Sequence, residues 1–269
     1  MLTTDLTGRL ALITGATGGI GYATSLALAS LGCSIAVHYN SAASTADELI
    51  QKLEEKGVKA KSFQADLSSY EATRKLHQDV VSHMGNPTIL FNNAGLIKGG
   101  SGIKDISEVS IEDFEATWKA NCGSAYLLTQ LCIPAMVEKS WGRVIFCSSV
   151  AGFTGGVVGP QYASSKSALH GLVHWLAGAY AKKGITVNGV APALIQETKM
   201  LPGDGDANGE LVKSKLIRDF LLSLLLIVIE IPIGRLGYPD EIAATVEWLV
   251  KTGYVTNKVV GVDGGMFVQ

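Results

Sequence analysis

The stretch RLALITGATGGIG, residues 9–21, decides the fold of this 269-residue chain. Its first six residues form a short apolar run of the kind that is buried on both faces of a parallel sheet. Glycines 15, 19 and 21 follow directly, and the helical pattern behind them ends at Gly32. Because glycine has no side chain, backbone N–H groups in such a turn can approach a pyrophosphate, whose charge the helix N-terminus stabilises. A simple turn is the alternative, but the position between strand and helix predicts a dinucleotide site.

The rest of the chain repeats this alternation of buried strand and amphipathic helix. Further strands are predicted at 34–39, 59–65, 88–91, 142–147, 185–190 and 258–262. Helices are predicted at 44–56, 68–84, 107–139, from 160 onward, and at 239–251. No internal repeat, low-complexity tract or linker is evident, so we expect one α/β domain over residues 1–269. Residues 196–232 break the alternation, and we interpret them as a flap over the site.

Composition excludes several classes of function. The chain is 47% hydrophobic and 17% charged with 31 glycines, which is typical of a compact α/β enzyme. A net charge of −2 without a basic run argues against a nucleic-acid partner. The four cysteines show neither a CxxC motif nor metal-ligand spacing, so we expect reduced thiols and no metal. The apolar run at 220–233 is too short and too interrupted to span a membrane, and we expect a cytoplasmic protein.

Two strand ends point to the nucleotide. The second predicted strand ends in His38-Tyr39-Asn40-Ser41, where a dinucleotide site faces the adenosine ribose. An acidic residue there would repel a 2′-phosphate, and its absence favours NADP(H) over NAD(H), although no Arg or Lys stands beside it. Asp66 closes the third strand where a carboxylate could contact the adenine amino group; capping the next helix is the alternative. Small residues in NNAG, 92–95, would let the backbone lie against a nucleotide.

A tyrosine and a lysine four residues apart suggest proton transfer. Tyr162 and Lys166 fall on one face of a helix that begins near Pro160. A nearby ammonium favours the phenolate, so we expect the tyrosine pKa to fall from ~10 to roughly 7 or 8. Such a phenol can donate or accept a proton at a carbonyl or alcohol oxygen. A chance pairing is the alternative. Ser148 and Ser149 end the strand at 142–147, and either hydroxyl can meet this helix across the cleft.

Asn121 lies inside the long helical region and is followed by Cys122-Gly123. A polar residue next to glycine permits a local kink, and a backbone carbonyl freed there could hold a water molecule. An ordinary, partly exposed asparagine is the alternative.

Taken in order, TGATGGIG, Asp66, NNAG, Asn121, Ser149, YASSK, ITVNGVAP and VDGG resemble the short-chain dehydrogenase/reductase family over residues 14–265. The resemblance implies a Rossmann-type, doubly wound sheet of seven parallel strands in the order 3-2-1-4-5-6-7 with helices on both faces. It implies a catalytic tetrad of Asn121, Ser149, Tyr162 and Lys166. Ser149 is preferred to Ser148 because it stands thirteen residues before the tyrosine, as in family members.

The mechanism implied by this resemblance is direct hydride transfer between nicotinamide C4 and a carbonyl carbon. Ser149 would bind the substrate oxygen and Tyr162 would transfer the proton. Lys166 would lower the tyrosine pKa and hold the nicotinamide ribose, and Asn121 would position a water. We expect the cofactor contacts to be Gly15, Thr17, Gly19, Ile20, Gly21, Asn40, Ser41, Asp66, Leu67, Asn93, Ala94, Gly95, Tyr162, Lys166, Pro192 and Ile195.

Within the family, IPIGRLGYPDEIAATVEWL and KVVGVDGG resemble the 3-oxoacyl-(acyl-carrier-protein) reductases of fatty acid biosynthesis. This implies a 3-oxoacyl thioester substrate, an acidic carrier protein that Lys183 would contact, and a homodimer or homotetramer. Two departures concern the flap: Pro192-Ala193 replaces the usual Pro-Gly, and Thr198 comes one residue late. The apolar run at 220–233 keeps open a reductase or dehydrogenase of another ketone or secondary alcohol, such as a secondary metabolite, polyol or steroid-like alcohol. A non-catalytic dinucleotide-binding scaffold is the remaining alternative.

Overall fold

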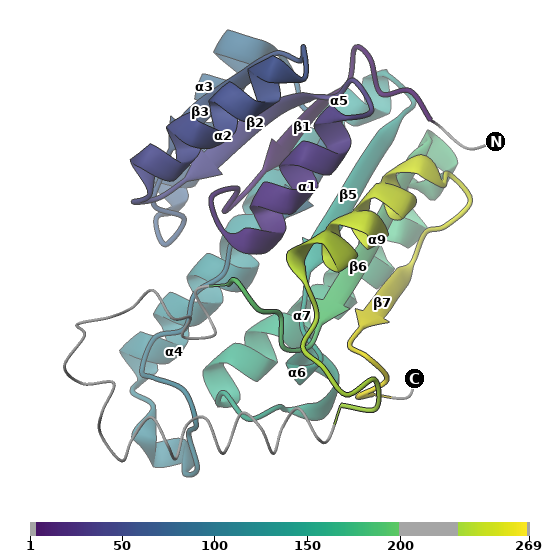
Figure 1. Ribbon diagram of the computed structural model, residues 1–269. Helices are drawn as coiled ribbons and strands as arrows, with labels where there is room; N and C mark the ends of the chain where they lie inside the picture. The colour runs from purple at the N-terminus through teal and green to yellow at the C-terminus, as the bar shows by residue number, and fades with distance from the viewer. Residues whose placement is uncertain (1–3, 199–230, 268–269) are drawn as a thin grey trace.

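The computed structural model describes residues 4–198 and 231–267 of the chain. Its centre is a sheet of seven parallel strands in the order β3-β2-β1-β4-β5-β6-β7 (Figure 1), which confirms the Rossmann-type order implied by the family resemblance. The strands are β1 (Leu10–Ile13), β2 (Ser34–Tyr39), β3 (Ala60–Gln64), β4 (Ile89–Asn92), β5 (Gly142–Cys147), β6 (Ile185–Pro192) and β7 (Lys258–Val262).

Helices cover both faces of this sheet. One face is packed by α1 (Gly19–Ala29), α2 (Ala43–Glu55) and α9 (Pro239–Lys251). The other is packed by α3 (Tyr70–Met84), α5 (Ser124–Glu138) and α7 (Pro160–Tyr180). Figure 1 shows α1 and α9 beside one another on the near side of the strands. Shorter elements are η1 (Ile106–Glu108), α4 (Ile111–Trp118), η2 (Lys119–Gly123), α6 (Ala151–Thr154) and η3 (Ala181–Lys183).

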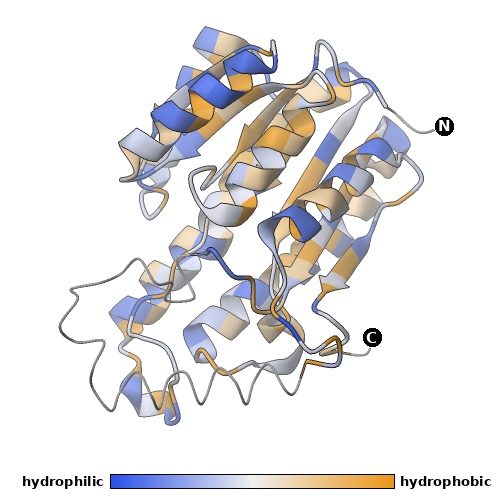
Figure 2. Cartoon of the chain, in the orientation of Figure 1, coloured by the Kyte–Doolittle hydropathy of each residue, from blue (hydrophilic) through white to orange (hydrophobic). Residues whose placement is uncertain are grey.

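The strand sequence explains the two layers. Side chains alternate along a strand, so Ala11 and Ile13 of β1 enter the core beneath α1 and α9, while Leu10 and Leu12 enter the opposite core. All four residues of β1 are buried, which is why this strand is a continuous apolar run. Figure 2 shows the central strands largely in the hydrophobic colour and hydrophilic residues along the outside of α2.

The carboxyl ends of the strands meet at one edge of the sheet. Ile13 pairs with Phe91, Asn92 pairs with Phe146, and Cys147 pairs with Val190. Because all these strands are parallel, the turns that follow β1, β4, β5 and β6 open toward the same side. The motifs singled out in the sequence therefore converge at this edge.

The long helix predicted at 107–139 is divided into several elements. After η1 and α4, one π-helical turn, η2, spans Lys119–Gly123, and α5 follows without a break. The backbone N–H of Ser124 accordingly donates to the carbonyl oxygen of Lys119. The kink predicted at Asn121 is thus present as a π-helical bulge, a feature that is frequent at functional sites.

Parts of the sequence interpretation lie outside the described residues. They include most of the flap predicted at 196–232 and most of the apolar run at 220–233. Residues 4–198 and 231–267 contain no group of three His, Cys, Asp or Glu side chains close enough to hold a metal ion. In the described part of the chain, no helix combines the length and the hydropathy that a membrane crossing requires.

Candidate active site

A cavity of about 420 Å³ opens at the carboxyl edge of the sheet. It is lined by nearly every residue that the sequence nominates for cofactor or catalysis: Gly15, Thr17, Gly19, Ile20, Asn40, Ser41, Asp66, Leu67, Asn93, Ala94, Gly95, Ser149, Tyr162, Lys166, Pro192 and Ile195. Gly21 and Asn121 are the two nominated residues that do not line it. Both lie directly behind the wall, as described below.

The glycine-rich turn joins β1 to α1 along one wall of the cavity. Gly15 has a left-handed φ of 60°, a conformation that glycine adopts without strain. Gly21 serves packing rather than ligand contact, because a Cβ there would lie only 2.8 Å from the Cα of Ala16 and 2.9 Å from Nδ2 of Asn93. The N-cap residue of α1 is Gly18, so no side chain caps the backbone N–H groups of the first turn, and this turn carries no acidic residue. The N–H groups at the start of α1 are therefore available to an anion.

The NNAG segment is tied to the same turn. Asn93 Nδ2 donates to the carbonyl oxygens of Thr14 and Gly15, at 2.9 and 3.1 Å. Thr14 Oγ1 accepts from the backbone N–H groups of Asn93 and Ala94, both at 2.9 Å. Asn92 points away from the cavity and donates to Thr129 Oγ1 at 3.1 Å. The two asparagines thus differ in role, since one fixes the nucleotide turn and the other braces α5.

His38 is a site residue that the sequence interpretation missed. Its Nδ1 accepts the N–H of Gly15 at 2.9 Å, so the ring proton lies on Nε2, which is 3.1 Å from the carbonyl oxygen of Ala65. The side chain is buried, and burial lowers its pKa to about 4. A neutral imidazole therefore connects the glycine-rich turn to the end of β3. A histidine inside the otherwise apolar strand SIAVHY was the signal that could have found it.

The end of β2 carries no carboxylate toward the cavity. Asn40 lines the cavity there, and its carbonyl oxygen accepts from Gln64 Nε2 at 3.1 Å. Asp66 does not cap the next helix, because Ser69 is the N-cap residue of α3 and accepts from the N–H of Ala72. Asp66 instead accepts from the N–H and Oγ of Ser68, at 2.9 and 2.7 Å, and these bonds lower its pKa. Its carboxylate is exposed at the cavity wall.

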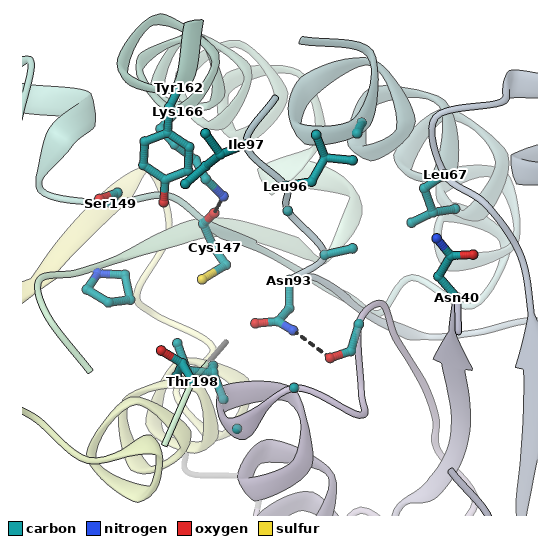
Figure 3. Close-up of a pocket in the computed structure, with 18 of the residues that line it drawn as sticks. Asn40, Leu67, Asn93, Leu96, Ile97, Cys147, Ser149, Tyr162, Lys166 and Thr198 are labelled. Atoms are coloured by element: carbon teal, nitrogen blue, oxygen red, sulfur yellow. Dashed lines mark hydrogen bonds between the residues drawn. The ribbon is translucent and has the colours of Figure 1, made fainter. Parts of the chain in front are cut away.

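Tyr162 and Ser149 meet across the cleft. They are joined by a side-chain hydrogen bond, and Figure 3 shows the tyrosine hydroxyl beside Ser149. Tyr162 is the third residue of α7, in its first turn, and Ser149 lies two residues after the end of β5. Of the two serines that the residues left open, Ser149 is therefore the one that contacts the tyrosine.

The expected acidification of Tyr162 is wrong for this structure. Burial raises the pKa of the Tyr162 hydroxyl above its ordinary value, and only the Ser149 hydrogen bond opposes that rise among the main causes. Lys166 Nζ donates to the carbonyl oxygen of Cys147 at 2.7 Å and lies 5.6 Å from the centre of the tyrosine ring. Burial also lowers the pKa of Lys166, because desolvation disfavours the charged form of the side chain.

Asn121 supports the site from behind. Its side chain is 1% exposed, and its Oδ1 accepts from the N–H of Leu96 at 2.8 Å. Its Nδ2 donates to the carbonyl oxygen of Leu96 and to Ser165 Oγ, both at 3.0 Å. A Cβ placed on Gly95 would lie 3.3 Å from Lys166 Nζ and 3.5 Å from Asn121 Oδ1. The asparagine thus joins the loop after β4 to α7 beside the lysine.

Further residues complete the cavity. Those that the sequence did not nominate include Leu96, Ile97, Ala120, Cys147, Ser148, Val158, Ala193, Leu194 and Thr198. Ile97 and Val158 pack against the small cluster that contains Tyr162, so the cavity has an apolar wall in this region. Thr198 reaches the cavity despite its late position, and its Oγ1 donates to the carbonyl oxygen of Ile195 at 2.7 Å.

A doubly wound sheet with a glycine-rich turn, a buried Tyr162 and Lys166 and a half-buried Ser149 is the arrangement of a dinucleotide-dependent oxidoreductase. Sequence comparison matches residues 9–208 to the short chain dehydrogenase family. The chain is 33% identical to 3-oxoacyl-(acyl-carrier-protein) reductase of Pseudomonas aeruginosa, over 98% of this chain and 100% of that relative. It is 32% identical to L-rhamnose 1-dehydrogenase (NADP+) of Thermoplasma acidophilum, over 98% of both. It is 30% identical to acetoacetyl-CoA reductase of Allochromatium vinosum, over 97% of this chain and 99% of that relative.

The protein therefore belongs to the short-chain dehydrogenase/reductase family. It is an NAD(P)-dependent oxidoreductase that acts on CH–OH or C=O groups.

Proposed function

We propose that this protein is an NADPH-dependent carbonyl reductase whose substrate is a 3-oxoacyl thioester. The observation that carries the proposal is the hydrogen-bonded pair of Tyr162 and Ser149 beside an apolar wall of Ile97 and Val158. The pair offers a proton and a hydrogen bond to a carbonyl oxygen, and the wall suits an acyl chain.

Tyr162 is the proposed proton donor. Because burial raises its pKa, the phenol is protonated at neutral pH and can give its proton to the alkoxide that develops during reduction. The hydroxyl of Ser149, hydrogen-bonded to the phenol, would hold the carbonyl oxygen in the same place. Both groups then stabilise charge that is largest in the transition state, which is the condition for a higher rate.

Lys166 and Asn121 have proposed supporting roles. An ammonium has three donors, and one of those on Lys166 goes to the carbonyl oxygen of Cys147. The remaining donors would hold the ribose of the nicotinamide nucleotide. Asn121 would keep the loop after β4 beside Lys166. We also propose that the π-helical turn at Asn121 binds a water molecule. When bound, the nicotinamide cofactor supplies the hydride.

The cavity wall fits a dinucleotide, and we propose NADP(H). The uncapped N–H groups at the start of α1 suit a pyrophosphate, and the cavity wall there is formed by Gly15 and Gly19, which have no side chains. The neutral pair Asn40 and Ser41 at the end of β2 would not repel a 2′-phosphate, as a carboxylate would. The NADP+ dependence printed in the name of the L-rhamnose relative supports the same preference.

The choice of substrate rests on relatives and on the apolar wall. Two of the relatives named above reduce 3-oxoacyl or acetoacetyl thioesters according to their names, whereas one is a sugar dehydrogenase. A polyhydroxylated sugar would leave hydroxyl groups against Ile97 and Val158 without hydrogen-bond partners. Lys183 is exposed just before β6, at the sheet edge opposite the cavity, and so adds no support for a carrier protein at this chain's own cavity. The carrier-bound thioester is therefore proposed from the relatives alone.

The test compares substrates under one assay. NADPH oxidation is followed with acetoacetyl thioesters of coenzyme A and of acyl carrier protein, and NADP+ reduction with L-rhamnose, D-glucose and a secondary alcohol panel. We expect thioester reduction with NADPH, and a weaker response with NADH. Good turnover of a sugar or a free ketone together with no turnover of either thioester would overturn the substrate assignment.

We also propose a homodimer or homotetramer in the cytoplasm. Tyr126 on α5 and Trp175 on α7 are exposed at 50% and 68%, which is consistent with helices that pack against a second copy. All four cysteines are free thiols, as suits a reducing compartment. Light scattering of the purified protein gives the oligomeric state directly.

A further inference from the structure

Ser148 stands next to the proposed catalytic serine, but it has a different set of partners. Its side chain is 3% exposed, and its Oγ lies 3.1 Å from the backbone carbonyl oxygen of Lys166. The Nε2 atom of His170 lies only 2.7 Å from the same Oγ. These contacts join a histidine one helical turn after Lys166 to the residue that follows β5.

The single hydroxyl proton of Ser148 determines which partner donates in each of its two hydrogen bonds. A serine hydroxyl has one proton to donate, and a carbonyl oxygen can only accept. Ser148 therefore donates to the Lys166 carbonyl, and His170 donates its Nε2 proton to Ser148. Burial lowers the pKa of His170, which favours the neutral imidazole, and the bond to Ser148 then requires the ring proton on Nε2. In this arrangement the Ser148 hydroxyl donates one hydrogen bond and accepts one.

The two bonds hold Lys166 from both ends. Lys166 Nζ donates to the carbonyl oxygen of Cys147, and the carbonyl oxygen of Lys166 accepts from the neighbouring residue Ser148. The backbone of Ser148 is itself fixed, because its N–H donates to the carbonyl oxygen of Val190 at 2.8 Å. The position of the ammonium near Tyr162 thus depends on where the Ser148 side chain is held.

Aromatic rings secure the imidazole from outside. The ring of Phe153 in α6 lies 4.3 Å from the His170 ring, and Phe267 stacks on Phe153 at 5.1 Å. The N–H of Phe267 donates to Asp263 at 3.0 Å, which orients this residue near the C-terminus. A Cβ on Gly152 would lie 3.0 Å from Ser148 Oγ and 3.1 Å from His170, so the group is closely packed on that side as well.

We propose that His170 is a positioning residue: its hydrogen bond to Ser148 fixes the backbone and ammonium of Lys166 beside Tyr162. The inference rests on the proposed roles of Tyr162 and Lys166 in the reduction. The stack of Phe153 and Phe267 holds the imidazole in the orientation that this bond needs.

Four variants test the proposal: His170→Gln, His170→Leu, Ser148→Ala and the double variant Ser148→Ala/His170→Leu. Glutamine keeps an N–H donor at a similar reach, whereas leucine keeps only the volume. We expect about tenfold lower kcat for His170→Leu and Ser148→Ala, which is the size of one lost hydrogen bond, and a smaller rise in KM for NADPH because the displaced ammonium also holds the ribose. The double variant should be no slower than either single one, because both remove the same interaction. His170→Gln should recover most of the rate.

A second readout does not depend on turnover. Ring-nitrogen NMR of the wild-type protein should show His170 protonated at Nε2 and unprotonated at Nδ1, and Ser148→Ala should weaken that preference. Kinetics use whichever carbonyl substrate the wild-type protein reduces best, so failure of the thioester assignment leaves the test intact. Wild-type kcat in both His170→Leu and Ser148→Ala, multiplicative losses in the double variant, or a proton on Nδ1 would each overturn the proposal.

Discussion

The ammonium of Lys166 donates to the backbone carbonyl of Cys147 at 2.7 Å, on the strand side of the cleft, rather than to the hydroxyl of Tyr162. The spacing of four residues places the two side chains on one face of α7, as the sequence predicted. The direction of the lysine side chain depends on the group that accepts its hydrogen bond, however, and here that group is the carbonyl oxygen of Cys147 at the end of β5. Lys166 is therefore tied to the end of β5, while burial raises the pKa of the Tyr162 hydroxyl and keeps it protonated.

Replacement of Tyr162 by phenylalanine removes the proposed proton donor and keeps the ring. We expect kcat for carbonyl reduction to fall by about 10²- to 10⁴-fold, the usual contribution of a positioned acid. Affinity for NADPH, measured by fluorescence titration, should stay within about threefold, because the glycine-rich turn and the β2 end are unchanged. Tyr126→Phe on the exposed face of α5 is the matched control. A Tyr162→Phe enzyme with wild-type kcat would remove the assignment of the proton donor.

His38 predicts a specific acid sensitivity. Its pKa is lowered from 6.5 to about 4 by burial, so the unfolded chain binds its proton more tightly than the folded one between these values. The stabilisation by neutral His38 is complete above about pH 6.5 and is lost as the pH falls through about 4, a total of about 3 kcal/mol. Urea unfolding at pH 7 and pH 4.5 measures the change in the free energy of unfolding.

The comparison for this pH effect is His38→Asn, whose side-chain oxygen can still accept the N–H of Gly15 while losing the titration. We expect a smaller loss of stability between pH 7 and pH 4.5 in this variant than in the wild type. His174→Asn, at an exposed position on α7, should leave the wild-type pH dependence in place. Equal pH dependence of wild type and His38→Asn would show that another group carries the effect.

Much of the fold and the site could be predicted from the sequence, for identifiable physical reasons. Strands buried on both faces appear in the sequence as continuous apolar runs, and a glycine-rich turn between such a run and a helical pattern indicates a strand–turn–helix unit. Chain order then brings Asn93, Ser149 and Tyr162 to one edge, because all strands of the sheet are parallel. The strand order itself came from the family resemblance rather than from the residues.

The remainder depends on contacts between distant residues. His38 was missed because nothing near it in sequence shows that Gly15 and Ala65 lie at its two ring nitrogens. His170 was missed because its partner Ser148 lies on another element. The sign of the Tyr162 pKa shift was wrong because residue spacing reports a shared helix face but gives neither burial nor the acceptor that a lysine selects.

Gly21 is expected to tolerate no side chain. A Cβ there would overlap the carbonyl oxygen of Gly15 and approach Asn93 Nδ2 at 2.9 Å, so Gly21→Ala must displace the turn that joins β1 to α1. We expect NADPH affinity to fall by tenfold or more, at about 1.4 kcal/mol per factor of ten. Gly178→Ala on the open surface of α7 is the control, and it should raise stability by roughly 0.5 kcal/mol or more. Unchanged cofactor binding in Gly21→Ala would contradict the packing role.

Gly123 of the π-helical turn lies directly against the side chain of Tyr70. A Cβ on Gly123 would overlap the Tyr70 hydroxyl and come within 2.9 Å of its ring carbons, and the ammonium of Lys119 lies 5.0 Å from the ring centre. Gly123→Ala should therefore shift η2, which carries Asn121, and lower kcat several-fold, although alanine is the better helix former. Tyr70→Ala removes the obstacle, so the double variant Tyr70→Ala/Gly123→Ala should be faster than Gly123→Ala alone. Steady-state kinetics and thermal unfolding of the three variants decide the matter: losses that simply multiply in the double variant would mean that Tyr70 does not constrain the turn.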